Sequence, residues 1–583
     1  MHNYSIDTLR HSCAHVLAQA IFRLFPDKKI ELGIGPTIEN GFYYDIDMDY
    51  KLTEADLNNI EKEMKQIIKE KLPIVKKVLT KSEAIELFSK ASQSLKVELI
   101  KELPDHEEIS CYSQGEFTDL CRGPHVENTG EIPPFFKLLH TAGAYWKGDS
   151  NRKMLQRVYA TGFLTKEELK EHLHFLEEAK KRDHRKLGKE LELFMFDLSS
   201  PAMPFFTPKG AFIYNGLLNF IRRIYPYYGY DEVITPQILE SELWHQSGHY
   251  EHYKENMYFT NIDDREYAVK PMNCPTHMIL FKNTKRSYRD LPIRYADFGR
   301  IHRYEKSGTL AGLTRVRSFA QDDAHIFIAL EGIQSEIKDL IKMFFSVYDH
   351  FGFTDVKIAL STRPEKKAGD DASWDKAEHA LKEALNSFGV KYEINEGDGA
   401  FYGPKIDFQV ADAIKRYHQL GTIQLDFQLP ERFDLTFTNS NGESERPVVI
   451  HRALLGSIER FFGLYLEHVA GAYPFWLAPT QVNLIPVNNN DHLEYAKKLF
   501  HELKKMNMRV NLDDRNESMG FKTRHTQKSK IPFMAVIGDK EIQSGTVSLR
   551  KYGAQDSTTV SLDEMKKLFN DLNKEILPKN LRD

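Results

Sequence analysis

The sequence predicts an α+β protein built from several domains. At 583 residues the chain is longer than one hydrophobic core normally serves. Its hydrophobic content of 41% and its charged content of 28% are ordinary for a globular protein. Segments with helical spacing of apolar residues alternate with short runs rich in Val, Ile, Phe and Tyr between Gly and Pro turns. This alternation favours a mixture of helices and sheets.

Four segments are expected, at residues 1–164, 165–190, 191–475 and 476–583. The first mixes a helix, strands and turns, and the third has the same mixture on a larger scale. In the last, strand and helix alternate, which predicts an α/β domain with parallel strands. Between the first and third segments, Thr165 and Glu168 have the spacing of a capping box. They predict one charged connector helix that runs to about Gly188.

Charge and cysteine content limit the classes of function. The formal net charge is −5, so a bound polyanion has to meet local basic patches such as residues 180–186, although a solvated helix face is the commoner meaning of such a run. The four cysteines are too few and too scattered for a disulfide framework. No signal peptide and no long apolar run is apparent. We therefore expect a cytoplasmic protein without membrane contact.

The most informative stretch spans residues 315–325. If it forms one strand, a single face carries two guanidiniums, an aromatic ring, an amide, a carboxylate and an imidazole, from Arg315, Arg317, Phe319, Gln321, Asp323 and His325. Guanidiniums suit phosphates, and a flat ring suits a nucleobase. A solvated strand face is the alternative. The preceding Arg303 and Glu305, and the glycine-bearing loop after them, argue against that alternative.

These residues carry a resemblance to the class II aminoacyl-tRNA synthetases. Arg303 and Glu305 with Arg315 and Phe319 resemble motif 2 of that class. Residues 229–236 resemble motif 1, and residues 449–460 resemble motif 3. The match is narrowed to the threonyl-tRNA synthetases by residues 270–275 and 322–325. The resemblance implies a mostly antiparallel catalytic sheet, an N-terminal α+β editing domain and a C-terminal α/β anticodon-binding domain. Bacterial members usually begin with a ubiquitin-like domain, which this sequence is expected to lack.

The resemblance also implies an activity and its residues. The enzyme would activate L-threonine with ATP and Mg²⁺ and transfer it to tRNA(Thr), as a homodimer formed through motif 1. Arg303 would contact the α-phosphate, Arg315 and Arg460 the other phosphates, Phe319 the adenine ring and Glu305 its amino group. Lys405 would join Arg303 and Arg460 as a catalytic residue. The remaining implied contacts are Gln419, Thr422 and Ser457 for ATP, and Met272, Gln321, Asp323, Tyr402 and Gln424 for threonine.

Cys274, His325 and His451 lie far apart in the sequence, so their spacing alone shows no metal site. The resemblance implies that they bind one Zn²⁺ per chain. One thiolate and two imidazoles leave a coordination position open, as in a working rather than a structural zinc site. In this family the amino and hydroxyl groups of threonine fill that position. Valine is nearly isosteric with threonine but has no hydroxyl to ligate the metal, and it is therefore rejected.

Serine does have a hydroxyl, and it lacks only a methyl group that is worth about 1–3 kcal/mol. A second, hydrolytic site is therefore expected. His11 and His15 lie one turn apart, off the apolar stripe of the first helix, which disfavours a core role but leaves a surface pair possible. With Cys121 and His125 they resemble the editing domains of threonyl- and alanyl-tRNA synthetases. The further candidates are Tyr44, Lys96 and Asp119. The same Cys/His set could bind zinc, but we favour a metal-free reaction in which water is activated.

In the last domain the resemblance implies that Asn516, Glu541 and Arg550 read anticodon bases, although the residues alone indicate only surface polarity. Three other functions stay open. The first is a regulator or RNA-binding module that has lost activation. The second is a metallohydrolase built on the histidines of the first domain. The third is another class II specificity, such as prolyl or seryl, which would not need the Cys/His/His set.

Overall fold

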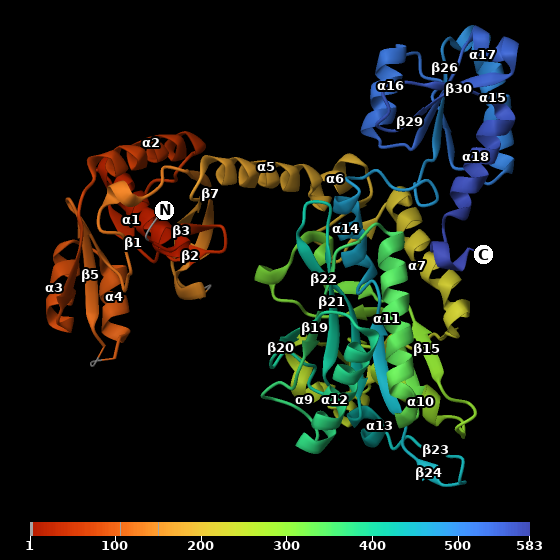
Figure 1. The fold of residues 1–583 in the computed structure, drawn as a ribbon, viewed down its shortest axis with the longest axis horizontal. Coiled ribbons are helices and arrows are strands. Elements are labelled where there is room, and N and C mark those ends of the chain that lie inside the picture. Colours follow the sequence, from red (N-terminus) through yellow and green to blue (C-terminus); the bar gives the residue numbers. More distant parts are fainter. Residues whose placement is uncertain (1–3, 105–106, 150, 583) are drawn as a thin grey trace. The chain divides into compact units, whose positions relative to one another are not determined.

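The computed structural model describes residues 4–104, 107–149 and 151–582, and it divides into two compact units, Met1–Glu177 and Glu178–Asp583 (Figure 1). Each unit has its own hydrophobic cores. Among the described residues, no helix combines the length and the apolar content that a membrane span requires. The four predicted segments divide the chain more finely than these two units, and their boundaries stay predictions.

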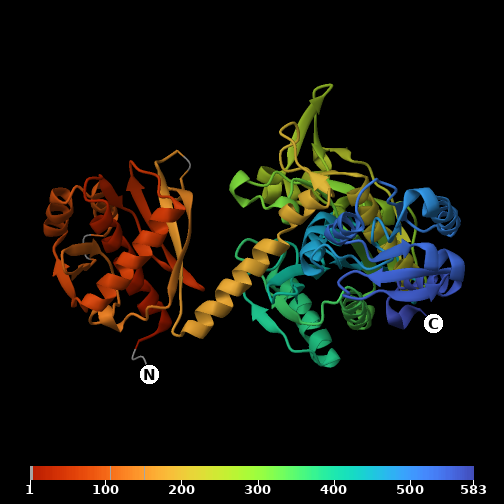
Figure 2. The ribbon, with the colours of Figure 1, turned by 90° about the horizontal axis from the view of Figure 1, so that it is seen from above.

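The first unit is built on an antiparallel five-stranded sheet. Its strands, in spatial order, are β1 (Ile30–Leu32), β3 (Gly41–Met48), β8 (Met154–Gly162) and β7 (Phe136–Tyr145), with β2 (Thr37–Ile38) beside β3. Helix α1 (Ile6–Leu24) contacts β3, and helix α2 (Glu54–Glu70) contacts β7 (Figure 2). The two helices also contact each other, and together they cover the sheet. A Thr53–Asp56 capping box begins α2.

A smaller antiparallel sheet completes this unit. Its members and their flanking helices are β4 (Ile74–Leu79), β5 (Ile109–Gln114), β6 (Phe117–Leu120), α3 (Lys81–Lys90), α4 (Ser94–Glu102), η1 (Thr129–Glu131) and η2 (Trp146–Gly148). The Gln19 side chain of α1 donates to the Gln114 backbone carbonyl of β5 and accepts from the Gln114 side-chain amide, and these two bonds tie α1 to this sheet. Because β6 ends at Leu120, the segment after it passes α1, and this placement brings Cys121 to His11.

The connector consists of two helices, α5 (Lys166–Arg182) and α6 (His184–Glu190). The predicted capping box is confirmed, because Thr165 and Glu168 exchange backbone-to-side-chain hydrogen bonds. The prediction of one helix to Gly188 is wrong. Asp183 interrupts it with an extended ψ of 121°, and its carboxylate begins α6 by accepting the Arg185 N–H at 2.8 Å.

The second unit contains an eight-stranded sheet in the order β11-β15-β18-β25-β22-β21-β19-β20. Only its two edge pairs, β11 with β15 and β19 with β20, are parallel, so the mostly antiparallel sheet is confirmed. The strands are β11 (Asp231–Glu232), β15 (Ile293–Asp297), β18 (Asp323–Ile328), β25 (Val448–Ala453), β22 (Tyr417–Asp426), β21 (Lys405–Ala411), β19 (Val356–Ser361) and β20 (Glu393–Asn395).

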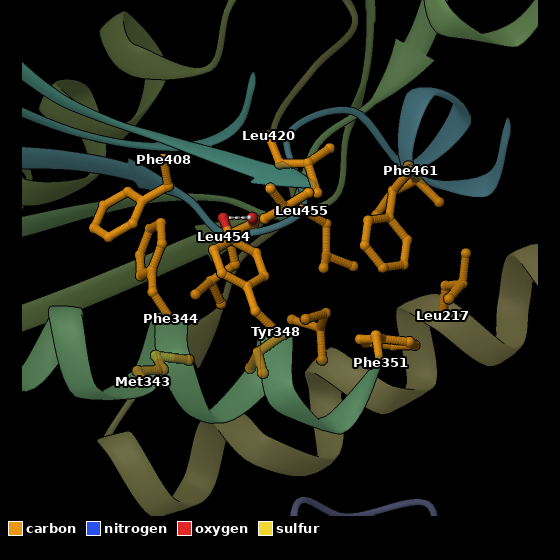
Figure 3. Packing of buried hydrophobic residues seen from close by; sticks show 14 of the residues in the cluster. Leu217, Met343, Phe344, Tyr348, Phe351, Phe408, Leu420, Leu454, Leu455 and Phe461 are labelled. Carbon is orange, nitrogen blue, oxygen red and sulfur yellow. Dashed lines mark hydrogen bonds between the residues drawn. The ribbon is translucent and has the colours of Figure 1, made fainter. Parts of the chain in front are cut away.

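The major helices of this region are α7 (Pro208–Tyr228), α10 (Cys274–Lys282), α11 (Ile333–His350), α12 (Asp371–Phe388) and α14 (Ile458–His468). Figure 3 shows how α11 packs in the largest core, where the ring of Phe344 is tilted against that of Phe408 of β21, with 4.4 Å between their centres. Tyr348 of the same helix donates a hydrogen bond to the Leu454 carbonyl at 2.9 Å. This bond fixes the segment between β25 and α14.

Shorter elements surround the sheet. They are β9 (Phe194–Met195), β10 (Phe205–Phe206), β12 (Ile238–Glu240), β13 (Tyr258–Ile262), β14 (Arg265–Val269), β16 (Arg300–His302), β17 (Ser318–Ala320), β23 (Phe437–Thr438), β24 (Ser444–Glu445), α8 (Ser241–Ser247), α9 (His249–Tyr253), α13 (Gln428–Arg432), η3 (Lys254–Asn256), η4 (Ser307–Thr309), η5 (Gly312–Thr314), η6 (Leu330–Gly332) and η7 (Lys579–Leu581).

The continuous strand predicted over 315–325 is wrong. The segment forms two strands in different sheets, because β17 pairs with β16 whereas β18 pairs with β15 and β25. The break falls at Asp322, whose buried carboxylate accepts the N–H groups of Leu454 and Leu455 at 2.8 and 2.9 Å. Those two bonds turn the chain toward the segment before α14.

The C-terminal region forms a five-stranded sheet in the order β27-β26-β28-β29-β30, and its first three strands are parallel as predicted. The elements are β26 (Val482–Pro486), α15 (Asn489–Lys505), β27 (Val510–Leu512), α16 (Met519–Lys528), β28 (Phe533–Ile537), α17 (Asp539–Ser544), β29 (Thr546–Lys551), β30 (Thr558–Ser561) and α18 (Leu562–Lys574). The last two strands join the sheet antiparallel.

Candidate functional sites

A polar cavity of about 440 Å³ opens beside strands β21 and β22 of the eight-stranded sheet. Its walls come from the β16–β17 hairpin, from β21 and β22 and from the start of α14. The lining contains Arg303, Glu305, Thr314, Arg315, Val316, Phe319, Gln321, Lys405, Asp407, Gln419, Leu420, Thr422, Gln424, Gly456, Ser457 and Arg460. Every residue that was predicted to contact ATP is therefore in the lining.

The guanidiniums of this cavity are held mainly through neutral partners. Arg303 donates to the Pro271 carbonyl at 3.2 Å and lies 5.2 Å from the centre of the Phe319 ring. Arg460 donates to the carbonyls of Gln419 and Thr314 at 3.0 and 3.1 Å. Burial, followed by repulsion from the neighbouring Arg315, lowers the pKa of Arg460. A polyanion in the cavity would relieve that unfavourable charge.

The backbone at the mouth of α14 approaches β22 closely. Gly456 has a φ of +68°, and a Cβ atom there would lie 2.8 Å from the Leu420 carbonyl oxygen. The next residue, Ser457, caps α14 by accepting the Arg460 N–H at 3.0 Å. The helix therefore begins at the cavity wall, where its N-terminal dipole favours negative charge.

A second polar group occupies the other wall. Lys405 forms ion pairs with Asp407 at 2.9 Å and Asp398 at 3.1 Å. Tyr402 donates a hydrogen bond to the Gln424 amide oxygen at 2.5 Å, and its ring stacks on that of His451 at 4.9 Å. Tyr402 thereby links Gln424, which lines the cavity, to His451 of the Cys/His cluster.

The side chains of Cys274, His325 and His451 converge in the interior, and their potential ligand atoms lie within 4.8 Å of one another. His325 and His451 are directly opposite each other on β18 and β25, and Cys274 is the first residue of α10. All three are buried. Burial raises the pKa of the Cys274 thiol well above its usual value, so a thiolate there needs a cation beside it.

The outer partners of the two imidazoles fit a metal between them. His277 faces His325, with 2.8 Å between their Nδ1 atoms, and the Asp426 carboxylate lies 2.9 Å from His451 Nε2. The remaining nitrogens, Nε2 of His325 and Nδ1 of His451, are buried and have no hydrogen-bond partner. A ligating imidazole has this arrangement, with one nitrogen held by a neighbour and the other one left for the metal.

Neither outer residue was predicted to act at the metal centre. His277 follows Cys274 by one helical turn, and this spacing was the available signal in the sequence. The proposed substrate residues lie nearby, because Asp323 accepts a hydrogen bond from Asn273 at 3.0 Å, and Met272 packs in the cluster that contains Cys274.

Arg317 is the member of the predicted polar face that lies elsewhere. It is buried, donates to the Glu305 carbonyl at 2.9 and 3.0 Å and lies over the Tyr304 ring. The prediction that it shares a site face is therefore wrong. Strict alternation fails at Arg317 because β17 begins only at Ser318, so Arg317 lies outside the strand.

The first unit contains a second Cys/His cluster, composed of His11, His15, Cys121 and His125, and its potential ligand atoms also lie within 4.8 Å of one another. Cys121 Sγ lies 3.1 Å from His11 Nε2 and 3.2 Å from His125 Nε2. His125 Nδ1 lies 3.0 Å from the Ser12 hydroxyl. Burial, with a smaller contribution from His15, lowers the pKa of His125 to about 2, so its ring is neutral.

A buried charged group adjoins this cluster. Asp119 forms an ion pair with Lys96 at 2.6 Å and accepts a short hydrogen bond from Tyr44. Asp119 lies 3.7 Å from His15 Nε2. Asp119, Lys96 and Tyr44 are each at most 2% exposed. All seven predicted editing residues thus lie together.

The argument that placed the histidines off the packing stripe of α1 is wrong for His15. Residues Leu9–Ile21, apart from His11, are buried on every side of the helix, and His15 is 2% exposed. The stripe was misleading because the helix lies between a sheet on one side and the β6–His125 segment on the other. The surface-pair alternative is excluded for His15 by the same observation.

The predicted anticodon residues lie around the C-terminal sheet. Asn516 is exposed in the loop between β27 and α16. Glu541 accepts the Gly538 N–H at 3.0 Å at the start of α17, and Arg550 donates to the Ala554 carbonyl at 2.8 Å. Two of the three therefore also bond within the domain.

Comparison with known families defines the class of the larger unit. The family described as tRNA synthetase class II core domain (G, H, P, S and T) matches residues 258–469. The family described as anticodon binding domain matches residues 481–572, and the threonyl and alanyl tRNA synthetase second additional domain matches residues 109–159. The chain thus has the domain set of a class II aminoacyl-tRNA synthetase.

Individual relatives narrow the class to a family. Threonine–tRNA ligase 2 of Bacillus subtilis is 53% identical over 561 residues, which cover 96% of this chain and 87% of that protein. A threonine–tRNA ligase of Clostridium botulinum is 52% identical over 565 residues, 97% of this chain and 88% of that protein. The chain belongs to the threonine–tRNA ligase family.

Solved structures agree with this assignment. The RNA binding domain of threonyl-tRNA synthetase from Cryptosporidium parvum matches 67% of this chain and 98% of its own, at 46% identity and a TM-score of 0.65. A prolyl-tRNA synthetase from Giardia lamblia matches 69% of this chain and 82% of its own, with a TM-score of 0.54. At 18% identity the second match supports the fold alone.

Proposed function

We propose that the protein activates L-threonine with ATP to threonyl-adenylate, transfers the threonyl group to the 3′ end of tRNA(Thr), and hydrolyses mischarged Ser-tRNA(Thr). The observation that supports this most strongly is the buried Cys274/His325/His451 set beside the polar cavity. Neither a prolyl nor a seryl specificity has a use for such a set. The complete motifs also argue against a regulator that has lost activation.

In the activation step the threonine carboxylate attacks the α-phosphate of ATP, and pyrophosphate leaves. The chain's contribution is to hold two anions together and to offset the charge that develops on the phosphate. Arg303 and Arg460 suit this role because neutral carbonyls position them and leave their charge for the substrate. Phe319 suits the adenine ring, and Mg²⁺ would accompany the ATP phosphates.

Cys274, His325 and His451 would hold one Zn²⁺ per chain. When bound, the zinc supplies a Lewis-acidic position that the amino and hydroxyl groups of threonine can ligate. Asp323 would accept a hydrogen bond from the substrate amine, and the stacked Tyr402 ring would close the pocket over His451. Because valine has no hydroxyl, the pocket would exclude it.

Hydrolysis of Ser-tRNA(Thr) is assigned to the cluster of His11, His15, Cys121 and His125. A neutral imidazole can accept a proton from water, and the buried Lys96–Asp119 pair offers charge close by. A metal is not required for this reaction. Asn516, Glu541 and Arg550 are proposed to contact the anticodon.

We further propose a cytoplasmic homodimer. Motif 1 presents Ile234, which is 90% exposed, beside Thr235, which is buried and hydrogen-bonded to Asp297. A strongly exposed isoleucine next to a buried, hydrogen-bonded threonine suits a subunit interface. Light scattering at micromolar concentration should give twice the chain mass. A fully active monomer would contradict the interface.

The activity is tested by ATP–pyrophosphate exchange with threonine, serine and valine, together with the zinc content per chain. We expect threonine and serine to support exchange and valine to fail. Exchange that valine supports as well as threonine does would overturn the specificity. Threonine charging without bound zinc would overturn the proposed role of the metal centre.

A further inference from the structure

His184 is the buried centre of the basic run 180–186, which the sequence indicated as a patch for polyanions or a solvated helix face. It is the first residue of α6 and is 5% exposed. Asp183, His184 and Glu467 also bring potential metal-ligand atoms together. Both ring nitrogens of His184 are occupied by hydrogen-bond partners, however, and this arrangement leaves no nitrogen for a metal.

Those two bonds determine the tautomer of the ring. The Leu313 N–H donates to His184 Nε2 at 3.0 Å, and a backbone N–H cannot accept. Nε2 therefore carries the lone pair and Nδ1 carries the proton. Nδ1 lies 2.6 Å from the Glu467 carboxylate, which also accepts the His184 N–H at 2.9 Å and pairs with Arg416. The imidazole is a neutral acceptor that faces Leu313 in a fixed orientation.

Leu313 belongs to η5, the turn that precedes Arg315. The neighbouring Thr314 carbonyl accepts the Arg460 guanidinium at 3.1 Å, and both Thr314 and Arg315 line the polar cavity. The hydrogen bond that His184 accepts from Leu313 therefore holds the η5 turn. Arg315 directly follows this turn, and Arg460 donates to a carbonyl within it. The contact is tight, because a Cβ atom on Gly312 would lie 2.2 Å from His184 Nε2.

The same junction includes the end of the connector. The Arg182 guanidinium donates to the Glu467 and His468 carbonyls at 3.4 and 3.0 Å, at the C-terminal end of α14. Since α14 begins at Ile458 and carries Arg460, the junction contacts both the far end of this helix and the η5 turn.

We infer that His184 is a positioning residue for the activation reaction: by accepting the Leu313 N–H, it sets the η5 turn and thereby the placement of Arg315 and Arg460 for ATP. The inference rests on the proposed function in that ATP is the cavity's substrate. It assigns a role in the nucleotide site to a residue outside the cavity lining.

Two substitutions distinguish the effects of the two hydrogen bonds that the His184 ring makes. His184→Asn keeps a donor near the Nδ1 position and removes the acceptor, whereas His184→Gln can place its amide oxygen near the Nε2 position and keep it. The experiment measures KM and kcat in threonine-dependent pyrophosphate exchange, and measures ATP binding directly by calorimetry. We expect His184→Asn to raise the KM and Kd for ATP about tenfold because a buried N–H loses its partner. We expect His184→Gln to stay within about twofold.

His492 supplies a matched control. It is a buried histidine in α15 of the C-terminal domain, and it likewise accepts a backbone N–H, from Asn488 at 3.0 Å, and pairs with a carboxylate, that of Asp539. Because Nδ1 is the acceptor in His492, the matched substitution is His492→Gln, which keeps a polar group near the Nε2 position and removes the acceptor. His492→Gln should lower the melting temperature and leave the KM for ATP unchanged. A rise in the KM for threonine equal to that for ATP in His184→Asn would indicate general damage and overturn the inference.

Gly312→Ala tests the same contact from the loop, in case His184→Asn does not fold. Its Cβ atom would displace η5 from His184, and we expect the KM for ATP to rise while the KM for threonine holds. Normal ATP affinity in Gly312→Ala, or equal losses in His184→Asn and His184→Gln, would overturn the inference. If the unaltered chain gives no exchange, the proposed function fails. The calorimetric comparison of ATP affinities still tests the role of His184 in that case.

Discussion

The two Cys/His clusters contain the same two types of side chain, with two histidines in the larger unit and three in the first, but they differ in what occupies the second nitrogens. In the larger unit, His277 and Asp426 hold the outer nitrogens of His325 and His451, and the inner nitrogens have no partner. In the first unit, Cys121 lies within hydrogen-bonding distance of His11 and His125. The arrangement in the larger unit leaves one nitrogen of each imidazole for a metal. In the first unit the cysteine pairs with two of the three imidazoles, and His15 Nδ1 is without a partner.

Their charged neighbours differ as well. A carboxylate bonds directly to His451 in the larger unit, and this contact makes the imidazole a stronger ligand. In the first unit, Asp119 is already neutralised by the buried Lys96 at 2.6 Å. The comparison teaches that ligand type and proximity do not by themselves define a metal site. The partners of the atoms that do not ligate help to decide its chemistry.

The largest effect should come from Cys274→Ser. The variant should lose its zinc and its threonine-dependent exchange, by on the order of 10³-fold or more, since the thiolate is the anionic ligand of the set. Metal analysis and exchange measure this. The matched control is Cys121→Ser, which should keep the same zinc content. Loss of zinc from Cys121→Ser instead would reverse the comparison between the clusters.

Arg303→Ala or Arg460→Ala should lower exchange by about 10²–10³-fold, because each removes charge from the place where negative charge develops. The zinc content and the deacylation of preformed Ser-tRNA(Thr) should not change. Near-normal exchange in either variant would remove that arginine from the activation site. Parallel loss of deacylation would mean that the variant is damaged as a whole.

The double variant His11→Ala/His15→Ala should lose deacylation of Ser-tRNA(Thr) by about 10²-fold while threonine charging holds. Because His15 is buried and His11 is not, His11→Ala alone shows whether deacylation falls through loss of a reacting group rather than through loss of packing. Deacylation that persists in both variants would move the water-activating group to other residues.

The sequence predicted the class of the fold from its composition and patterning, and the membership of both clusters through the resemblance of its motifs to a known family. It could not predict how the segments bend. The Asp322 carboxylate bonds to Leu454 and Leu455, far along the chain, and such a contact is invisible to strand periodicity. His277 was missed for the same reason, since its role depends on facing His325 across the core. The turn at Asp183 likewise interrupts the helix that the continuous helical pattern predicted to run to Gly188.

The smallest expected effect is a loss of stability in the first unit at mildly acidic pH. Burial lowers the pKa of His125 from an ordinary 6.5 to about 2, so the folded state keeps this ring neutral. The unfolded chain takes up a proton as the pH falls below 6.5, and the folded state does not. Stability is therefore present above pH 6.5 and declines below it, by less than about 1 kcal/mol between pH 7 and 6.

Hydrogen exchange across Ile6–Leu24, corrected for intrinsic rates, measures this decline in the full chain, and His125→Gln should reduce its slope. Peptides from α11 serve as the internal control, because that helix belongs to the other unit. With zinc bound, the cluster of Cys274, His325 and His451 should lose stability only where protons displace the metal, and added zinc should offset that loss. Protection of α1 that stays constant from pH 7 to 5 would mean that His125 takes up its proton in the folded state. The contrast between a neutral hydrogen-bonded cluster and a metal-binding cluster would then no longer hold.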